Sequence, residues 1–224
     1  MSNILYVGPS WAHRSYDTSM GVESDYTNLY RELKLDVVDL SKPGTSNWYF
    51  LNKFDQNSTN CYKEDYSGII WVYPEPMLDI IDIKSSIESE DFWEIRSEHN
   101  RQQLQEINDI GVPVAIIGAH SDIVDCDYPN ITVIHPSWQK FLAEYSNTTL
   151  DHGWGCEVAH RYILEESLKT KPSRSVVDYV SDTWAVWCKL DLNRVFCWCH
   201  PNRLGTELFA NEIKSNLFAW KNNL

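Results

Sequence analysis

The amino-acid sequence predicts an α/β protein built on a parallel five-stranded sheet with helices on both faces. Two observations predict this class: short apolar runs alternate with helical patterns between residues 3 and 135, and each run ends in turn residues. A β-α-β-α rhythm of this kind is typical of parallel sheets that are covered on both sides. Because no linker rich in Pro, Gly or Ser divides the 224 residues, we expect a single domain over 1–224.

Five apolar runs are the candidate strands of this sheet. They are NILYVG (3–8), LDVVDL (35–40), GIIWVY (68–73), VPVAIIG (112–118) and NITVIH (130–135). Each run has the length of a strand and is rich in the β-branched and aromatic residues that strands favour. We therefore expect each run to supply one strand.

The segments between these runs carry the patterns of helices. An amphipathic helix is expected over about 22–34, and a second short helix contains NWYFLNKF (47–54). The clearest helix is expected over 91–111, because this segment is long, mixes both signs of charge and closes at Gly111.

Beyond residue 150 the alternation of strands and helices gives way to a different pattern. A helix is expected over 156–169, followed by an extra β-hairpin around 183–199 with its turn at 191–193. The segment ELFANEIKSNLFAW (207–220) has the periodicity of an amphipathic helix and closes the chain.

Charge excludes two classes of partner. The formal net charge of −13 repels a phosphate backbone and an anionic bilayer, and no cluster of Lys and Arg interrupts it. We therefore expect no nucleic acid and no membrane as partners. No apolar stretch approaches the roughly 18 residues of a membrane span, and the N-terminus lacks the pattern of a secretory signal. We expect a cytoplasmic protein whose six cysteines are reduced thiols.

Ligands of an open parallel sheet bind outside the carboxyl ends of its strands. The segments that follow the first four predicted strands are GPSWAHR (8–14), SKPGTSN (41–47), YPEP (73–76) and AHSD (119–122). These four segments are therefore where we expect the functional site.

Three blocks of the chain resemble those of the SGNH (GDSL) hydrolases. YVGPSW (6–11) is similar to the nucleophile block, LSKPGTSN (40–47) to the glycine block, and CHPNRLG (199–205) to the block whose histidine precedes Pro and a helix. The blocks follow the family's order and span nearly the whole chain. The resemblance implies a three-layer, flavodoxin-like fold and a serine hydrolase of an ester, for example an O-acetyl group on a glycan, without a cofactor.

The resemblance implies roles for three residues. Ser10 would be the nucleophile and His200 the general base, and the backbone N–H groups of Ser10 and Gly44 would bind the oxyanion. Glycine suits the last role because no side chain blocks the approach of its amide. Each residue alone also has a structural interpretation: a helix cap for Ser10, a turn residue for Gly44, and a hydrogen-bonded structural residue for His200.

The sequence departs from the family at the oxyanion hole. The aspartate that precedes the serine is replaced by Pro9, and VYPEP (72–76) lacks the Gly and Asn of the third block. Loss of one oxyanion donor costs on the order of a hundredfold in rate. Donors that substitute for the missing Asn would have to come from Asn47, Tyr73 or His120.

A further departure concerns the group that orients the histidine. The family places an aspartate three residues before the histidine, and this position is Cys197. A thiol orients an imidazole less well than a carboxylate does. What remains is a Ser-His dyad, with Asp178, Asp182 or a backbone carbonyl as the candidate orienting group.

Two alternatives remain open for the same residues. Cys188, Cys197, Cys199 and His200 form a soft metal-ligand set, but zinc sites commonly separate paired cysteines by two to four residues, so we expect no metal. The missing Asn and Asp instead favour a catalytically degenerate SGNH-fold protein that binds a partner. The glycine block also resembles SGNH-like proteins of large tailed phages, which implies a virion-associated structural role. The sequence does not indicate the oligomeric state.

Overall fold

The computed structural model describes residues 3–13, 28–42, 45–54, 66–74, 92–119, 123, 126–145, 196–197 and 200–224. It describes Ser10, Cys197 and His200 at the level of the backbone.

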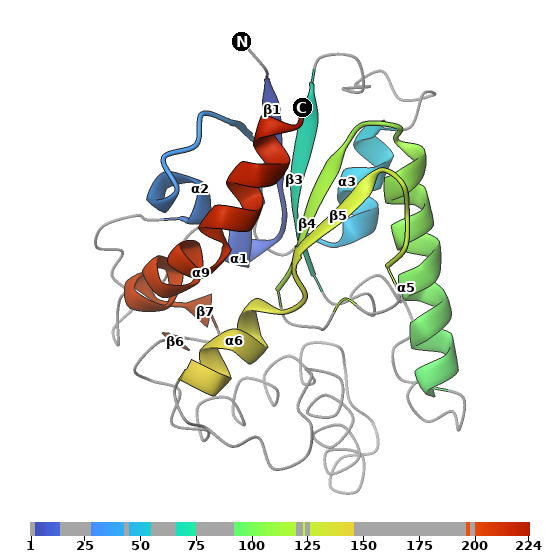
Figure 1. Cartoon of the computed structure of the whole chain (residues 1–224). Helices are drawn as coiled ribbons and strands as arrows, with labels where there is room; N and C mark the ends of the chain where they lie inside the picture. Colours follow the sequence, from blue (N-terminus) through green and yellow to red (C-terminus); the bar gives the residue numbers. More distant parts are fainter. Residues whose placement is uncertain are drawn as a thin grey trace, which may run out of the picture.

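The centre of the molecule is a five-stranded, all-parallel sheet (Figure 1). Its strands are β1 (Ile4–Val7), β2 (Val38–Asp39), β3 (Gly68–Tyr73), β4 (Val114–Gly118) and β5 (Ile131–His135). The strand order is β2-β1-β3-β4-β5, the doubly wound order in which the direction of winding reverses between β1 and β3. The prediction of a three-layer, flavodoxin-like α/β sheet is confirmed, and each strand lies within its predicted run.

The position of each strand in the sheet explains its composition. All side chains of β3 and β4 are buried, as expected for central parallel strands that are covered on both faces. At one edge both residues of β2 are exposed, and at the other edge β5 mixes buried and exposed positions. The predicted run over 35–40 therefore contributes only two residues to the sheet.

Helices cover both faces of the sheet (Figure 1). The α5 face carries α3 (Asn47–Phe54) and α5 (Phe92–Asp109), and both helices were predicted. The opposite α9 face carries α2 (Leu29–Glu32), α6 (Trp138–Tyr145) and α9 (Arg203–Asn222). None of the helices that the structure describes combines the length and apolar composition needed to cross a bilayer.

On the α9 face, the predicted closing helix over 207–220 is confirmed as α9, which is longer at both ends. The helix predicted over 22–34 is described only from residue 28 and is a single turn there. The sequence patterns did not predict α6. The helix predicted over 156–169 lies outside the described residues.

A small antiparallel pair precedes α9. It consists of β6 (Phe196–Cys197) and β7 (His200–Pro201), with Cys197 opposite His200. The hairpin predicted around 183–199 lies outside the described residues except for β6. The backbone of His200 is therefore on a strand two residues before the N-cap of α9, Asn202.

Candidate active site

The turn that leads from β1 into α1 (Ser10–His13) depends on Gly8. Gly8 has a φ of +155°, and a Cβ there would lie 2.6 Å from the Ala12 Cβ and 2.8 Å from the Val72 carbonyl oxygen. Only glycine allows this approach of the turn to β3, because any side chain would collide with backbone. The local sequence thus holds the start of α1, at Ser10, close to the carboxyl edge of the sheet.

Two side chains hold the end of α1. The Tyr6 hydroxyl donates to the Ala12 carbonyl oxygen at 3.2 Å, and the Asn28 amide donates to the His13 carbonyl oxygen at 3.3 Å. Burial, and to a smaller degree the charge of Asp39 and the neighbouring Tyr30, raise the pKa of Tyr6 well above its usual value. The phenol therefore remains a protonated donor, and carbonyls at the end of this short helix have partners.

The segment after β2 runs beside this turn. The Leu40 N–H donates to the Tyr6 carbonyl oxygen at 2.9 Å, and the Lys42 N–H donates to the Gly8 carbonyl oxygen at 3.0 Å. Hydrogen bonds between this segment and the segment that contains β1 therefore continue past the end of β2. Gly44, the predicted second oxyanion donor, lies outside the described residues, but Lys42 and Thr45 on either side of it lie within them.

The strand that contains His200 reaches the same edge. β7 contacts both α1 and α9. Asn202 starts α9 by accepting a hydrogen bond from the Gly205 N–H at 2.9 Å. Two segments far apart in the sequence, one beginning at Ser10 and the other containing His200, are therefore neighbours in space.

Asn47 and Tyr73, two of the residues predicted as substitute oxyanion donors, belong to a buried polar network on the α5 face. The Asn47 amide donates to Gln103 Oε1 at 2.7 Å, and its Oδ1 accepts from the Trp71 indole at 3.0 Å. The Tyr73 hydroxyl lies 3.0 Å from both Asn100 Oδ1 and Gln103 Oε1. Because the side chain of Asn47 is 0% exposed, these contacts direct its carboxamide into the core.

The remaining predicted site residues fall outside what the structure describes. His120 is one of them, and so are the side chains of Cys197 and His200 and the candidate ligands Cys188 and Cys199. Among the side chains that are described, no group of three or more His, Cys, Asp or Glu residues is arranged to hold a metal ion.

Sequence reasoning overlooked His13, which lies one helical turn after Ser10. Its Nδ1 is 3.2 Å from the Ser41 carbonyl oxygen and 3.3 Å from Ser41 Oγ. Residues three apart on a helix are neighbours on one side of it. That spacing in SWAH (10–13) was the available signal, since it brings an imidazole to the edge of the sheet where α1 lies.

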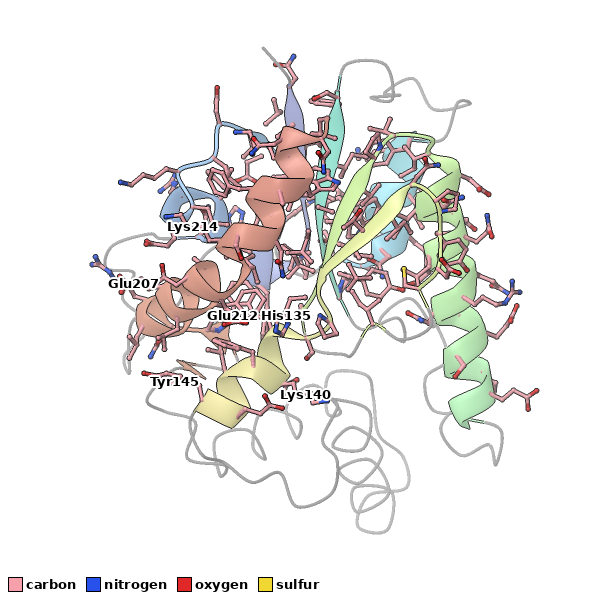
Figure 2. The ribbon with its side chains drawn as sticks, in the orientation of Figure 1. His135, Lys140, Tyr145, Glu207, Glu212 and Lys214 are labelled. Atoms are coloured by element: carbon pink, nitrogen blue, oxygen red, sulfur yellow. The ribbon has the colours of Figure 1, made fainter. Side chains whose placement is uncertain are left out.

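A second histidine that the sequence patterns did not single out is His135, at the carboxyl end of β5. Figure 2 shows its ring where β5 leads into α6, beside α9. The ring makes edge contacts with Phe141 and Phe209, at centroid distances of 5.9 and 5.1 Å, and its Nδ1 accepts from the Ser137 N–H at 3.2 Å. These contacts assign His135 a packing role at the start of α6.

The chain was also compared with known proteins. No protein-family model and no curated protein matches the sequence. Among solved structures, the chain is similar to the X-ray crystal structure of protein YxiM from Bacillus subtilis, with 14% sequence identity and a TM-score of 0.40. The match covers 96% of this chain and 56% of that chain, so this chain spans little more than half the length of that structure.

Proposed function

We propose that the protein is a serine hydrolase of the SGNH type that cleaves a carboxylic or acetyl ester of a small molecule or a glycan. Ser10 attacks the ester carbonyl and His200 takes the serine proton. The backbone N–H groups of Ser10 and Gly44 stabilise the oxyanion. The proton then passes from His200 to the departing alcohol, and water releases the acyl group from Ser10 in a second round of the same steps.

The observation that carries the proposal is the contact between α1, which begins at Ser10, and β7, which contains His200. Both elements lie at the carboxyl edge of the sheet, and β1 is one of the two strands that flank the switch point. This is where open α/β sheets bind their ligands. The proposal is also supported by the tight turn at Gly8 and the hydrogen bond from the Lys42 N–H to the Gly8 carbonyl oxygen, which join the turn after β1 to the start of the loop after β2.

Labelling with a fluorophosphonate probe tests the proposal, because such probes react with activated serines. We expect an adduct that mass spectrometry maps to Ser10, is absent in Ser10→Ala and forms far more slowly in His200→Ala. Ser67→Ala is the matched control, since the Ser67 hydroxyl donates to Asn3 at the amino edge of the sheet. A wild-type protein that stays unlabelled beside a reacting serine hydrolase in the same tube would overturn the proposal.

The pairing of Cys197 with His200 permits a gain-of-function test. Residues directly opposite in an antiparallel pair project from the same face, with Cβ atoms about 4.5–5.5 Å apart. This backbone register is the reason to expect that a carboxylate introduced in Cys197→Asp can orient the imidazole. Removing this carboxylate from a complete triad lowers the catalytic rate by up to about ten-thousandfold. We therefore expect Cys197→Asp to hydrolyse a simple acyl ester faster than the wild type. The double variant with Ser10→Ala should show no such gain.

A second candidate function is that of an SGNH-fold binding or virion-associated structural protein without catalysis. The buried network that holds Asn47 and Tyr73 favours it, because these side chains use their polar atoms inside the core. In that case the folded wild-type protein would not react with the probe, and Cys197→Asp would gain no activity.

A further inference from the structure

We propose that His13 is a positioning residue that fixes the loop after β2 (residues 41–46) against the end of α1. The inference rests on the proposed function, because this loop contains Gly44, one of the two proposed oxyanion donors. It adds a role for an imidazole that is neither the nucleophile nor the general base.

The neighbours of His13 determine which ring nitrogen carries the proton. A carbonyl oxygen only accepts, so the Ser41 carbonyl requires a donor at Nδ1, 3.2 Å away. Ser41 Oγ donates its own proton to Asp39 Oδ1 at 2.5 Å and can only accept from the ring, at 3.3 Å. His13 therefore donates from Nδ1 to Ser41, and the ring can do so in its neutral and its protonated form.

Both partners of this hydrogen bond are themselves held in place. Ser41 is buried, and its N–H donates to the Asp39 carboxylate at 2.8 Å. The His13 carbonyl accepts from the Asn28 amide, which also caps α2 by accepting from the Arg31 N–H. His13 thus connects α1, the start of α2 and the loop after β2.

The far end of the loop is fixed by different contacts. Asn47, the first residue of α3, is bonded to Gln103 and Trp71 inside the core. Within the loop, the Thr45 hydroxyl donates to the Lys42 carbonyl oxygen at 2.5 Å. Effective oxyanion stabilisation requires donors that need little reorganisation during the reaction, and we expect the contacts of Ser41 and Asn47 to favour this for a donor between them.

Two substitutions at residue 13 separate positioning from acid–base chemistry. His13→Ala removes the hydrogen bond to Ser41, whereas His13→Asn retains an amide N–H near the position of Nδ1 and removes Nε2. We expect the rate constant for labelling of Ser10 to fall about ten- to a hundredfold in His13→Ala and to recover in His13→Asn. Asn108→Ala is the matched control, because it removes a buried side-chain contact to the Asn130 N–H at the opposite edge and should leave the labelling rate unchanged.

Hydrogen exchange of the Lys42 amide provides a readout that does not depend on activity. This amide is bonded to the Gly8 carbonyl oxygen, so its exchange should accelerate in His13→Ala and not in His13→Asn. If the wild type is unlabelled but Lys42 exchange responds in this way, the proposed function fails and the positioning contact stands. If the wild type is labelled and His13→Ala matches it in labelling and in exchange, the positioning role is overturned. Equal slowing by Ala and Asn would also overturn it.

Discussion

The two faces of the sheet hold their helices by different kinds of contact. On the α9 face, Trp138 stacks on Phe209 at a centroid distance of 4.5 Å with the ring planes 9° apart, and Trp11 packs edge-on against Trp138 at 5.7 Å. On the α5 face, a network of hydrogen bonds joins Asn47, Trp71, Tyr73, Asn100 and Gln103. The first face depends on apolar packing, and the second combines packing with directional bonds.

The two kinds of contact are expected to contribute differently to the fold: apolar packing mainly to its stability, and hydrogen bonds mainly to the exact placement of side chains. Apolar burial is non-directional and supplies most of the free energy of folding, whereas a hydrogen bond contributes a net ~1 kcal/mol but fixes direction and distance. The α9 face should therefore keep α9, and with it β7, docked on the sheet. The α5 face should contribute less to stability per contact and more to the placement of Asn47, where the loop after β2 ends.

The largest expected effect is from Phe209→Ala on the α9 face. The ring is fully buried, and its removal leaves a cavity beside Trp138 and His135. We expect the free energy of unfolding to fall by about 3–5 kcal/mol, measured by urea denaturation. A loss below about 1 kcal/mol, the size expected for an exposed site, would show that the aromatic stack does not carry the stability of this face.

Gln103→Leu is the corresponding change on the α5 face. The side chain keeps a similar size, but the buried Asn47 amide loses its acceptor and Tyr73 loses one of two. We expect the free energy of unfolding to fall by about 1–3 kcal/mol and the labelling of Ser10 to be slower. Gln105→Leu on the exposed side of the same helix is the control, with a change within about 0.5 kcal/mol. If Gln103→Leu labels at the wild-type rate, the network does not position the loop.

Tyr73→Phe removes one donor from the same network and keeps the ring. Asn100 and Gln103 each lose one hydrogen bond, and Gln103 keeps its bond from Asn47. We expect the free energy of unfolding to fall by about 0.5–1.5 kcal/mol. The rate of Ser10 labelling should be unchanged, since the contacts of Asn47 remain. A labelling defect as large as that of Gln103→Leu would place Tyr73 in the site itself.

The smallest expected effect is a dependence of stability on alkaline pH through Cys126, at the margin of the α5 face. Burial, and then the charge of Asp127, raise the pKa of this thiol from 9.0 to about 11. The folded state therefore holds the proton more tightly than the unfolded state, so this stabilisation is complete below about pH 9 and declines toward pH 11. The urea midpoint of the wild type should fall more steeply than that of Cys126→Ala as the pH rises from 8 to 10. Parallel curves would contradict the assignment.

Local patterns were sufficient to predict the sheet and the long helices. The runs that became β3 and β4 are continuously apolar because those strands are covered on both faces. The length of β2 was not predictable from its run, because it depends on pairing with β1, which is distant in the sequence. The helix α6 was missed as well, although Ser137 caps it by accepting from the Lys140 N–H.

The candidate site was predictable only in part. The position of Ser10 just after β1 follows from the predicted strand, whereas the direction of the Asn47 carboxamide depends on Gln103, which is 56 residues away in the sequence. His13 was overlooked because its role depends on Ser41 and on the proton that Ser41 donates to Asp39. Contacts between distant segments, which no local pattern encodes, decide these assignments.

A crystal structure of the phosphonylated protein would show whether Ser10 and the loop after β2 form the proposed oxyanion-binding site of an ester hydrolase. We expect a bond from Ser10 Oγ to phosphorus, with the phosphoryl oxygen about 2.7–3.1 Å from the backbone nitrogens of Ser10 and Gly44. We also expect the His200 ring beside Ser10 Oγ, and the His13 ring still hydrogen-bonded to Ser41. An adduct on another residue, or a phosphoryl oxygen that faces solvent away from the loop, would contradict the proposal.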